Sequence, residues 1–434
     1  MNSDARVKAY DVLSIVEKGN LLDAALSSQL NALGSRQDKS FLAELVKGTA
    51  RYAGRYDYLI DKFTKRSPDP SIRILLRLGM YQLFNCNSVP DYAAVNETVN
   101  AARKVGFHKL SSFINAVLQN VRRTVEGNPE GLIGLFPSPE KEPLQYLTTW
   151  YSHPEWMVKR WLEKFSFADC EKLCAHNNCP AHLTLHLNPE LDRSELFSYF
   201  EKHDIEYSES DLVSSAVIIK SRLARDSIND LLSEFTQVIV QDQSVQSAMD
   251  HFSPHLSGNI FDMCAAPGGK TVNMLWRMPE DATLVAMDSV KKRMVKVVDN
   301  LARVGESDTP LLVADGLKMP FTDNAYDTIL LDGPCSGTGV IRHHPEGRWQ
   351  LTEKRIFSSG EMLFQLAQNA VDILAPGGKL LYATCSLEPE ENEIVINRLL
   401  EENSQLSVVE KGKYWLPQTD GADGFFAAIV TRVK

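Results

Sequence analysis

The chain has 434 residues, of which 44% are hydrophobic and 24% are charged, with a net charge of −10. This composition excludes a fibrous repeat and wholesale disorder, and at about 150 residues per domain the length predicts roughly two to four domains. No apolar run approaches the roughly 18 residues that a membrane helix needs. The first positions carry an acidic residue where a signal peptide has basic ones. We therefore expect a soluble, cytoplasmic protein.

Charge is distributed unevenly along the chain. Residues 1–123 carry 18 Lys and Arg against 11 Asp and Glu, whereas residues 124–250 carry 10 against 21. A basic N-terminal third on an acidic protein is a weak indication of a nucleic-acid partner.

The seven cysteines form no short-spaced disulfide framework. Their odd number in a cytosolic type of sequence draws attention to reactive thiols instead. Cys170, Cys174 and Cys179 have a spacing that matches neither paired zinc ligands nor a familiar iron–sulfur cluster. We therefore expect no metal site.

Residues 1–123 are predicted to be entirely helical. Apolar side chains recur every three or four positions, as at Ile72, Leu75 and Leu76, and Pro70 falls near a helix start. The stretch 101–123 carries several basic residues and no acidic one. It is either a solvated helix face or an RNA contact. The predicted RNA contacts here are Arg103, Lys104, Arg122 and Arg123.

Residues 126–143 are predicted to be a linker because glycine and proline recur throughout them. A small α/β segment is expected over 144–240. Its predicted elements are helices at 144–165 and 194–203 and strands at 182–187 and 215–219.

Strands and helices alternate in the C-terminal part, which is typical of a doubly wound α/β domain with a mainly parallel sheet. The predicted strands are 260–263, 284–287, 311–313, 328–331 and 379–383, and the predicted helices are 271–276, 291–304, 352–374 and 391–402.

The first of these strands runs into a glycine turn that opens a helix, an arrangement that binds ligands over backbone N–H groups. The turn matches neither the dinucleotide fingerprint nor the P-loop. Asp288, Asp315 and Asp332 end the next three strands, which places them at one edge of the sheet. Asp288 is placed to bind ribose hydroxyls and Asp315 to meet an adenine edge. The predicted nucleoside-cofactor site comprises Cys264, Ala265, Ala266, Pro267, Gly268, Gly269, Lys270, Asp288, Asp315 and Asp332.

Two cysteines, Cys335 and Cys385, each follow a predicted strand end. A lone cysteine at such a place is more often a packing residue than a catalytic one. Two at the cleft edge of one sheet, one of them near Asp332, indicate thiol chemistry, although position alone does not say which thiol attacks.

Three motifs, D-M-C-A-A-P-G-G-K-T, D-G-P-C-S-G-T-G and Y-A-T-C-S-L-E-P-E-E-N, resemble the signatures of the S-adenosylmethionine-dependent RNA 5-methylcytosine methyltransferases of the Nol1/Nop2/Sun family. This resemblance covers about residues 145–434. Residues 76–83 and 93–99 resemble the antitermination factor NusB, which has an RNA-binding helical fold. Gly333, where the family often has Ala, and the variable region 287–289 are the small departures.

The resemblance implies a NusB-like RNA-binding domain at 1–125, a small α/β RNA-binding subdomain at 144–240 and a Rossmann-like methyltransferase domain at 241–434. It implies methyl transfer to C5 of a specific cytosine in 16S ribosomal RNA, either free or in a partly assembled small subunit. It further implies a monomer that uses S-adenosylmethionine and needs neither a metal nor a membrane.

By the same resemblance, Cys385 is the nucleophile that adds to C6 of the cytosine. Asp332 stabilises the charge that moves onto the ring, and Cys335 helps to remove the C5 proton. Arg342 and Arg348 follow the Cys335 loop and are candidates for contacts with the RNA backbone, with plain surface charge as the alternative.

Two other functions compete with this interpretation. A DNA cytosine methyltransferase would use the Pro-Cys thiol as nucleophile, lack the Thr-Cys-Ser thiol and lack a NusB-like domain. A non-catalytic RNA-binding assembly factor would not need two cysteines together with a complete cofactor turn.

Overall fold

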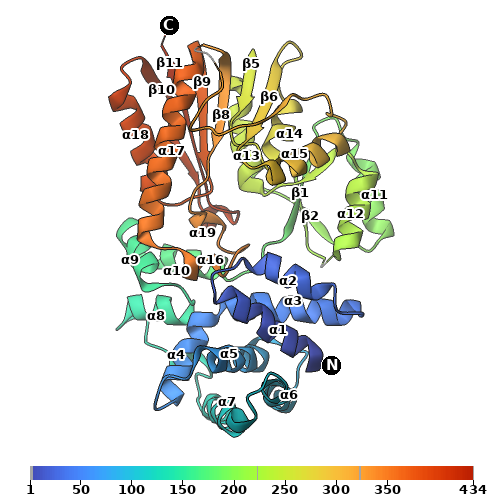
Figure 1. Ribbon diagram of the computed structural model, residues 1–434, viewed down its shortest axis with the longest axis vertical. Coiled ribbons are helices and arrows are strands. Elements are labelled where there is room, and N and C mark those ends of the chain that lie inside the picture. Colours follow the sequence, from blue (N-terminus) through green and yellow to red (C-terminus); the bar gives the residue numbers. More distant parts are fainter. Residues whose placement is uncertain (1–2, 222, 322–323, 434) are drawn as a thin grey trace. The chain divides into compact units, whose positions relative to one another are not determined.

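The computed structural model describes residues 3–221, 223–321 and 324–433. The chain divides into two compact units, which are described separately (Figure 1). The helical unit comprises Met1–Pro180 together with Ile341–Leu351, and the sheet unit comprises Ala181–Val340 together with Thr352–Lys434. Over the described ranges, no helix is long and apolar enough to cross a membrane.

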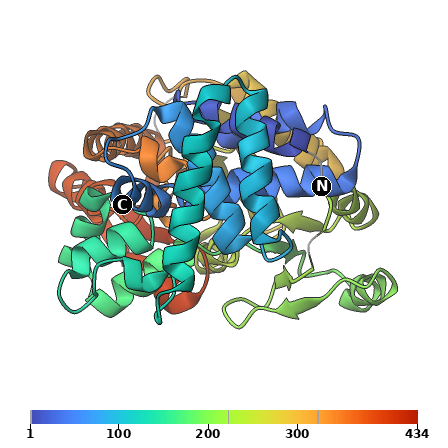
Figure 2. The same cartoon turned by 90° about the horizontal axis from the view of Figure 1, so that it is seen from below.

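The helical unit confirms the all-helical prediction for the N-terminal part. Its first helices are α1 (Ser3–Val16), α2 (Leu22–Leu30), α3 (Arg36–Arg51), α4 (Ala53–Phe63), α5 (Pro70–Asn85), α6 (Asp91–Lys104) and α7 (Ser111–Glu126). Figure 2 views this unit from below, with α6 and α7 as the two long teal helices. Pro70 begins α5 as predicted, and the Asp69 carboxylate caps the helix by accepting the Ser71 N–H at 2.9 Å.

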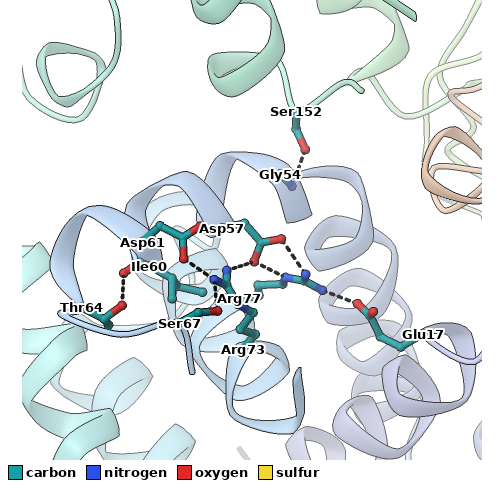
Figure 3. Close-up of polar contacts among 10 residues, drawn as sticks. All are labelled: Glu17, Gly54, Asp57, Ile60, Asp61, Thr64, Ser67, Arg73, Arg77 and Ser152. Atoms are coloured by element: carbon teal, nitrogen blue, oxygen red, sulfur yellow. Dashed lines mark hydrogen bonds and ion pairs between the residues drawn. The ribbon is translucent and has the colours of Figure 1, made fainter. Parts of the chain in front are cut away.

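Two basic residues of α5 are neutralised inside this unit (Figure 3). Asp57 on α4 accepts from Arg73 at 3.1 Å and from Arg77 at 2.6 Å. Arg73 also pairs with Asp61, and Arg77 with Glu17. Part of the basic charge of residues 1–123 is therefore neutralised by internal ion pairs.

The segment after α7 differs from its prediction. Leu135 and Phe136, in the predicted linker, are buried in the helical core, and Phe136 stacks on Tyr58 with ring centroids 5.1 Å apart. The predicted helix 144–165 is two helices, α8 (Pro143–Trp150) and α9 (Glu155–Lys164), followed by α10 (Phe167–Asn177). Ser152, whose φ is 59°, and Pro154 interrupt the helix, since neither fits a helix interior.

A small four-stranded antiparallel sheet begins the sheet unit, with strand order β2-β3-β1-β4. Its elements are β1 (Leu183–Leu187), α11 (Arg193–Lys202), β2 (Tyr207–Glu209), β3 (Ala216–Ile219), α12 (Arg225–Glu234) and β4 (Val238–Val240). Leu185, Phe200 and Val217 are buried in its core. The predicted strands and helix are present, whereas β2, β4 and α12 are too short or too polar to have been predicted.

The large sheet has seven strands in the order β10-β11-β9-β8-β5-β6-β7. They are β5 (Asn259–Asp262), β6 (Thr283–Asp288), β7 (Leu311–Val313), β8 (Tyr326–Asp332), β9 (Leu374–Thr384), β10 (Leu406–Trp415) and β11 (Phe425–Arg432). The five strands from β5 to β9 pair in parallel, while β11 is antiparallel to both β9 and β10. The α/β prediction is confirmed, and the sheet is mixed because of the unpredicted hairpin β10–β11.

Helices cover both faces of this sheet (Figure 1). On one face pack α13 (Gln243–Phe252), α14 (Gly269–Leu275) and α15 (Lys291–Arg303), and on the other pack α17 (Glu353–Ile373) and α18 (Glu393–Glu402). Strands β6 and β8 lie on opposite sides of β5, so the chain reverses direction across the sheet there. Ligands of open α/β sheets bind beyond the carboxyl ends of the strands at such a reversal.

Candidate active site

The predicted cofactor turn leaves the carboxyl end of β5. Gly268 has φ of 104°, and a Cβ atom there would lie 3.2 Å from the Cα of Val297, so the position requires glycine. Thr271 donates to the buried Asp262 carboxylate at 2.7 Å. Burial raises the pKa of Asp262 to about 7, although the Thr271 hydrogen bond opposes the rise.

A cavity of about 210 Å³ lies against this turn. It is lined by Val240, Gln241, Asp242, Val245, Asp262, Cys264, Ala265, Ala266, Pro267, Gly269, Lys270 and Asp332. Seven of the ten predicted cofactor residues are in this set, while Gly268, Asp288 and Asp315 are not. Gln241 was not predicted; it follows β4 and accepts from Asn273 at 2.8 Å. No motif in the sequence marks it.

Asp288 and Asp315 stand beyond the ends of β6 and β7, as predicted, in different surroundings. Asp288 is 3% exposed and accepts the N–H of Ala266 at 3.3 Å and of Val290 at 2.9 Å. It therefore joins the end of β6 to the cofactor turn. Asp315 is exposed and accepts the N–H of Leu317 at 3.0 Å.

Lys270 and Asp332 form an ion pair beside the cavity, with Nζ 2.5 Å from Oδ2. Burial lowers the pKa of Lys270, but the Asp332 carboxylate outweighs burial and the net pKa is raised. Lys270 also lies 5.4 Å from the centroid of the Phe425 ring. A fixed positive charge therefore stands at the cleft edge of the sheet.

The two predicted thiols are brought together. The Sγ atoms of Cys335 and Cys385 are 3.2 Å apart, and both side chains are half-buried. The hydrogen bond to Cys385 and burial together raise the pKa of Cys335 well above its ordinary value. The raised pKa disfavours the thiolate that an attacking Cys335 would need, and either sulfur can be the donor in the contact between the two.

Sequence reasoning missed Glu391, which lies between the two cysteine loops. It was placed in a helix that begins at residue 391, whereas α18 begins at Glu393 and Pro389–Glu391 forms a short 3-10 turn. This turn directs the Glu391 side chain to Ser336 and Ser386. The run of acidic residues after Cys385 was the available signal, but it does not say which of them is buried.

The four basic residues predicted to contact RNA lie on α6 and α7. Arg103, Lys104 and Arg123 are exposed. Arg122 is half-buried, with its Nε 3.6 Å from the Glu126 carboxylate one turn later. The acid-free run 101–123 therefore has a compensating acid just beyond its end.

The structure contradicts the surface position expected for Arg342 and Arg348. Arg342 is 8% exposed and Arg348 is completely buried. The guanidinium of Arg348 donates to Ser152 O at 3.0 Å, to Asn178 Oδ1 at 2.9 Å and to Asn177 O at 3.0 Å. Burial lowers the pKa of Arg348 to about 9. The RNA contact predicted for Arg348 is wrong because its guanidinium is buried and donates to acceptors at Ser152 and at the end of α10.

Cys170 and Cys174 are buried on α10. Among the residues that the structure describes, no group of three or more His, Cys, Asp or Glu side chains could hold a metal ion.

Three family models match the chain. They are 16S rRNA methyltransferase RsmB/F over residues 249–431, the NusB family over residues 3–123, and the ferredoxin-like domain of RsmF/B-like methyltransferases over residues 153–225. The ribosomal RNA small subunit methyltransferase B of Enterobacter sp. (strain 638) is 33% identical over 435 residues, covering 97% of this chain and 96% of that protein. The chain belongs to the RsmB/F family of 16S rRNA methyltransferases. The family uses S-adenosylmethionine, so both the enzyme class and the cofactor are as predicted.

Solved structures share the fold of this RsmB/F-family chain. The crystal structure of PH0851 has a TM-score of 0.79 at 22% identity and covers 99% of both chains. The crystal structure of NSun6 from Pyrococcus horikoshii with SFG has a TM-score of 0.56 at 18% identity, covering 65% of this chain and 98% of that one.

Proposed function

We propose that this enzyme methylates C5 of one cytosine in 16S ribosomal RNA through a covalent bond between Cys385 and C6 of the base. The observation that carries the proposal is the pair of Sγ atoms 3.2 Å apart. Supporting it, the Lys270–Asp332 ion pair lies at the same edge of the sheet. Curated relatives named ribosomal RNA small subunit methyltransferase B support the RNA substrate.

The chemistry requires two thiols because C5 of cytosine is a weak nucleophile. Addition of the Cys385 thiolate to C6 moves the ring electrons onto C5, which can then attack an electrophilic carbon. Bound S-adenosylmethionine supplies that carbon as a sulfonium methyl group. Cys335, after giving up its own thiol proton to solvent, then takes the C5 proton as a thiolate, and the electron pair left on the ring expels the Cys385 sulfur from C6.

Lys270 and Asp332 would act on the charge that develops during the attack. The ammonium of Lys270 offsets negative charge moving toward N3 and O2 of the ring, and Asp332 holds the ammonium in place. Because both side chains are partly buried, this stabilisation exceeds what the same pair would give in water.

The residues around the 210 Å³ cavity fit the cofactor. Gly269 lines the cavity, and a Cβ atom there would lie 3.5 Å from Nε2 of Gln241, another lining residue, so glycine leaves room for a ligand close to the backbone. The buried Asp288 carboxylate lies against the same turn. We assign Cys264–Lys270, Asp288, Asp315 and Asp332 to hold S-adenosylmethionine. Asp288 would bind the ribose hydroxyls and Asp315 would meet the adenine edge.

Residues 1–125 are proposed to add RNA affinity without taking part in the chemistry. The exposed residues Arg103, Lys104 and Arg123 are suited to bind phosphates, with Arg122 as a weaker contributor because it faces Glu126. Residues 144–240 are assigned to RNA binding and residues 241–434 to methyl transfer. The chain is proposed to act as a monomer in the cytoplasm.

The test is bisulfite sequencing of 16S ribosomal RNA from cells with and without the gene, and with the gene encoding Cys385→Ala. One cytosine should be protected from conversion only when the intact gene is present. Labelled methyl transfer to free 16S RNA, to partly assembled small subunits and to duplex DNA identifies the substrate. Transfer to duplex DNA alone would favour the DNA enzyme. No transfer to any of them would favour an assembly factor.

A further inference from the structure

Glu391 bonds to both cysteine loops at once. Its side chain is completely buried. Oε1 accepts the backbone N–H of Ser336 at 2.6 Å, and Oε2 accepts the hydroxyl of Ser336 at 2.5 Å and the hydroxyl of Ser386. Ser336 directly follows Cys335 and Ser386 directly follows Cys385. One carboxylate therefore holds the residue next to each thiol.

Further hydrogen bonds join the same two loops. The N–H of Gly339 donates to the carbonyl of Cys385 at 3.0 Å, and the N–H of Leu387 donates to the Thr338 hydroxyl at 2.9 Å. The carbonyl of Glu391 itself accepts from the Tyr382 hydroxyl on β9 at 2.5 Å. Glu391 is thus fixed to the sheet by its backbone and to both loops by its side chain.

The donors around Glu391 match an ionised carboxylate, which can only accept. Burial raises the pKa of Glu391, while the hydrogen bonds from Ser336 and Ser386 lower it. Removal of this acceptor would leave a buried backbone N–H without a partner, which is costly. The loops would then separate or rearrange.

We propose that Glu391 is a positioning residue that sets the separation between the Cys335 and Cys385 thiols. C5 and C6 of cytosine are bonded neighbours, so two thiols that act on them in turn must be held within a few ångströms of each other. The catalytic consequence rests on the proposed function. The mechanical role of Glu391 does not, because it concerns only the distance between two sulfur atoms.

Oxidation of the two thiols measures that distance without RNA or cofactor. The full-length protein is treated with diamide, which takes two electrons and two protons from the thiols and becomes the hydrazine as they form a disulfide. The Cys335–Cys385 peptide is then counted by mass spectrometry over time. Glu391→Ala should slow this disulfide about tenfold or more, because the two loops no longer share a common anchor.

Two variants serve as comparisons. Glu391→Gln should oxidise at close to the wild-type rate, since its amide oxygen can accept the Ser336 N–H and its amide nitrogen can donate to hydroxyls that turn around. Glu393→Ala is the matched control, because that carboxylate, two residues away, accepts from Tyr414 at 2.7 Å. It should oxidise like wild type. If Glu391→Ala does not fold, Ser386→Ala removes one of the three donors and should give an intermediate slowing.

Methyl transfer provides the second measurement. Glu391→Ala should reduce kcat about 100-fold with unchanged affinity for S-adenosylmethionine, and Glu391→Gln should restore most of it. An oxidation rate in folded Glu391→Ala, and in Ser386→Ala, equal to that of wild type overturns the proposal. If wild type makes no 5-methylcytosine while the oxidation series behaves as expected, the proposed function fails and the positioning role stands.

Discussion

The Nζ atom of Lys270 lies 2.5 Å from Oδ2 of Asp332, and this contact joins the first turn of α14 to the end of β8, 62 residues apart in the chain. Lys270 follows β5 and Asp332 ends β8, which are hydrogen-bonded neighbours. In the free protein Asp332 is therefore a carboxylate paired with an ammonium. A role in which Asp332 donates a hydrogen bond to cytosine needs a proton from elsewhere, because the ion pair raises the pKa of Lys270 and so keeps the proton on the ammonium.

The cofactor assignment predicts that Asp288→Ala weakens S-adenosylmethionine binding. At about 1–3 kcal/mol for charge-assisted hydrogen bonds, affinity should fall roughly 5- to 150-fold. Isothermal titration calorimetry measures the affinity for S-adenosylmethionine. The comparison is Asp288→Asn, whose single amide oxygen can accept only one of the two N–H groups, from Ala266 and Val290, that Asp288 holds. Unchanged affinity in folded Asp288→Ala would remove Asp288 from the cofactor site.

RNA binding by the helical unit predicts a change in salt dependence. Conversion of Arg103, Lys104, Arg122 and Arg123 to Gln should weaken RNA binding. The slope of log K against log salt should flatten by about 0.7–0.9 for each phosphate that the protein no longer neutralises. Conversion of four exposed lysines in the segment assigned to methyl transfer, Lys291, Lys292, Lys296 and Lys354, to Gln controls for net charge. If the slope does not change, this face of α6 and α7 is only solvated. The affinity for S-adenosylmethionine should be the same in wild type and in all of these variants.

The burial of Arg348 predicts a structural defect and no change in RNA affinity. Arg348→Met leaves three acceptors, Ser152 O, Asn177 O and Asn178 Oδ1, without their donor. We expect a loss of about 1–3 kcal/mol in the stability of the helical unit, measured by urea unfolding. Lys159→Met is the exposed control. If Arg348→Met is stable and its RNA binding depends less steeply on salt than that of wild type, then Arg348 does contact RNA.

Asp262 predicts a stability that depends on pH. Burial raises its pKa to about 7, against roughly 3.9 in the unfolded chain. Between those values the folded protein holds a proton that the unfolded chain has lost, so stability falls as pH rises from about 4 to about 7. The slope is at most about 1.4 kcal/mol per pH unit. Asp262→Asn cannot ionise, so its advantage over wild type should grow across this window and stay constant above it.

The comparison with Asp262→Asn is needed because the titration of His186 changes the stability with pH in the opposite direction. Burial lowers the pKa of His186 to about 3, so this residue removes stability as pH falls through 6.5 toward 3. Its contribution is present in both proteins and cancels in the difference. Urea unfolding midpoints from pH 4 to pH 8 measure that difference. A constant difference over the whole range would show that Asp262 is ionised in the folded protein.

Local sequence patterns predicted the strands of the large sheet, and the rules of parallel-sheet topology predicted which residues share one edge of it. Buried apolar runs located β5, β6 and β8, and because parallel strands end at one edge, Cys335 and Cys385 were placed at one cleft. Contacts between residues far apart in the chain could not be predicted from the sequence. Arg348 is 170 residues from Asn178, whose side-chain oxygen is one of the acceptors that accompany its burial. The hairpin β10–β11 was missed because Gly412 and charged residues interrupt the apolar alternation of β10.

The last prediction separates the roles of the two thiols. If Cys385 attacks C6, Cys385→Ala has no nucleophile and forms no covalent complex with RNA. Cys335→Ala still attacks and methylates but cannot readily remove the C5 proton, so a protein–RNA adduct should accumulate. The assay is a denaturing gel of each variant incubated with substrate RNA and S-adenosylmethionine, with nuclease treatment to identify the adduct.

The geometry favours this order of events. The hydrogen bond to Cys385 and burial raise the pKa of Cys335, which disfavours the thiolate form that an attacking group needs. Lys270 places its positive charge where it also interacts with Cys385. An adduct confined to Cys385→Ala would reverse the assignment and make Cys335 the nucleophile, as in the DNA enzymes. An adduct confined to Cys335→Ala, and absent again from the double variant, would establish Cys385 as the attacking thiol.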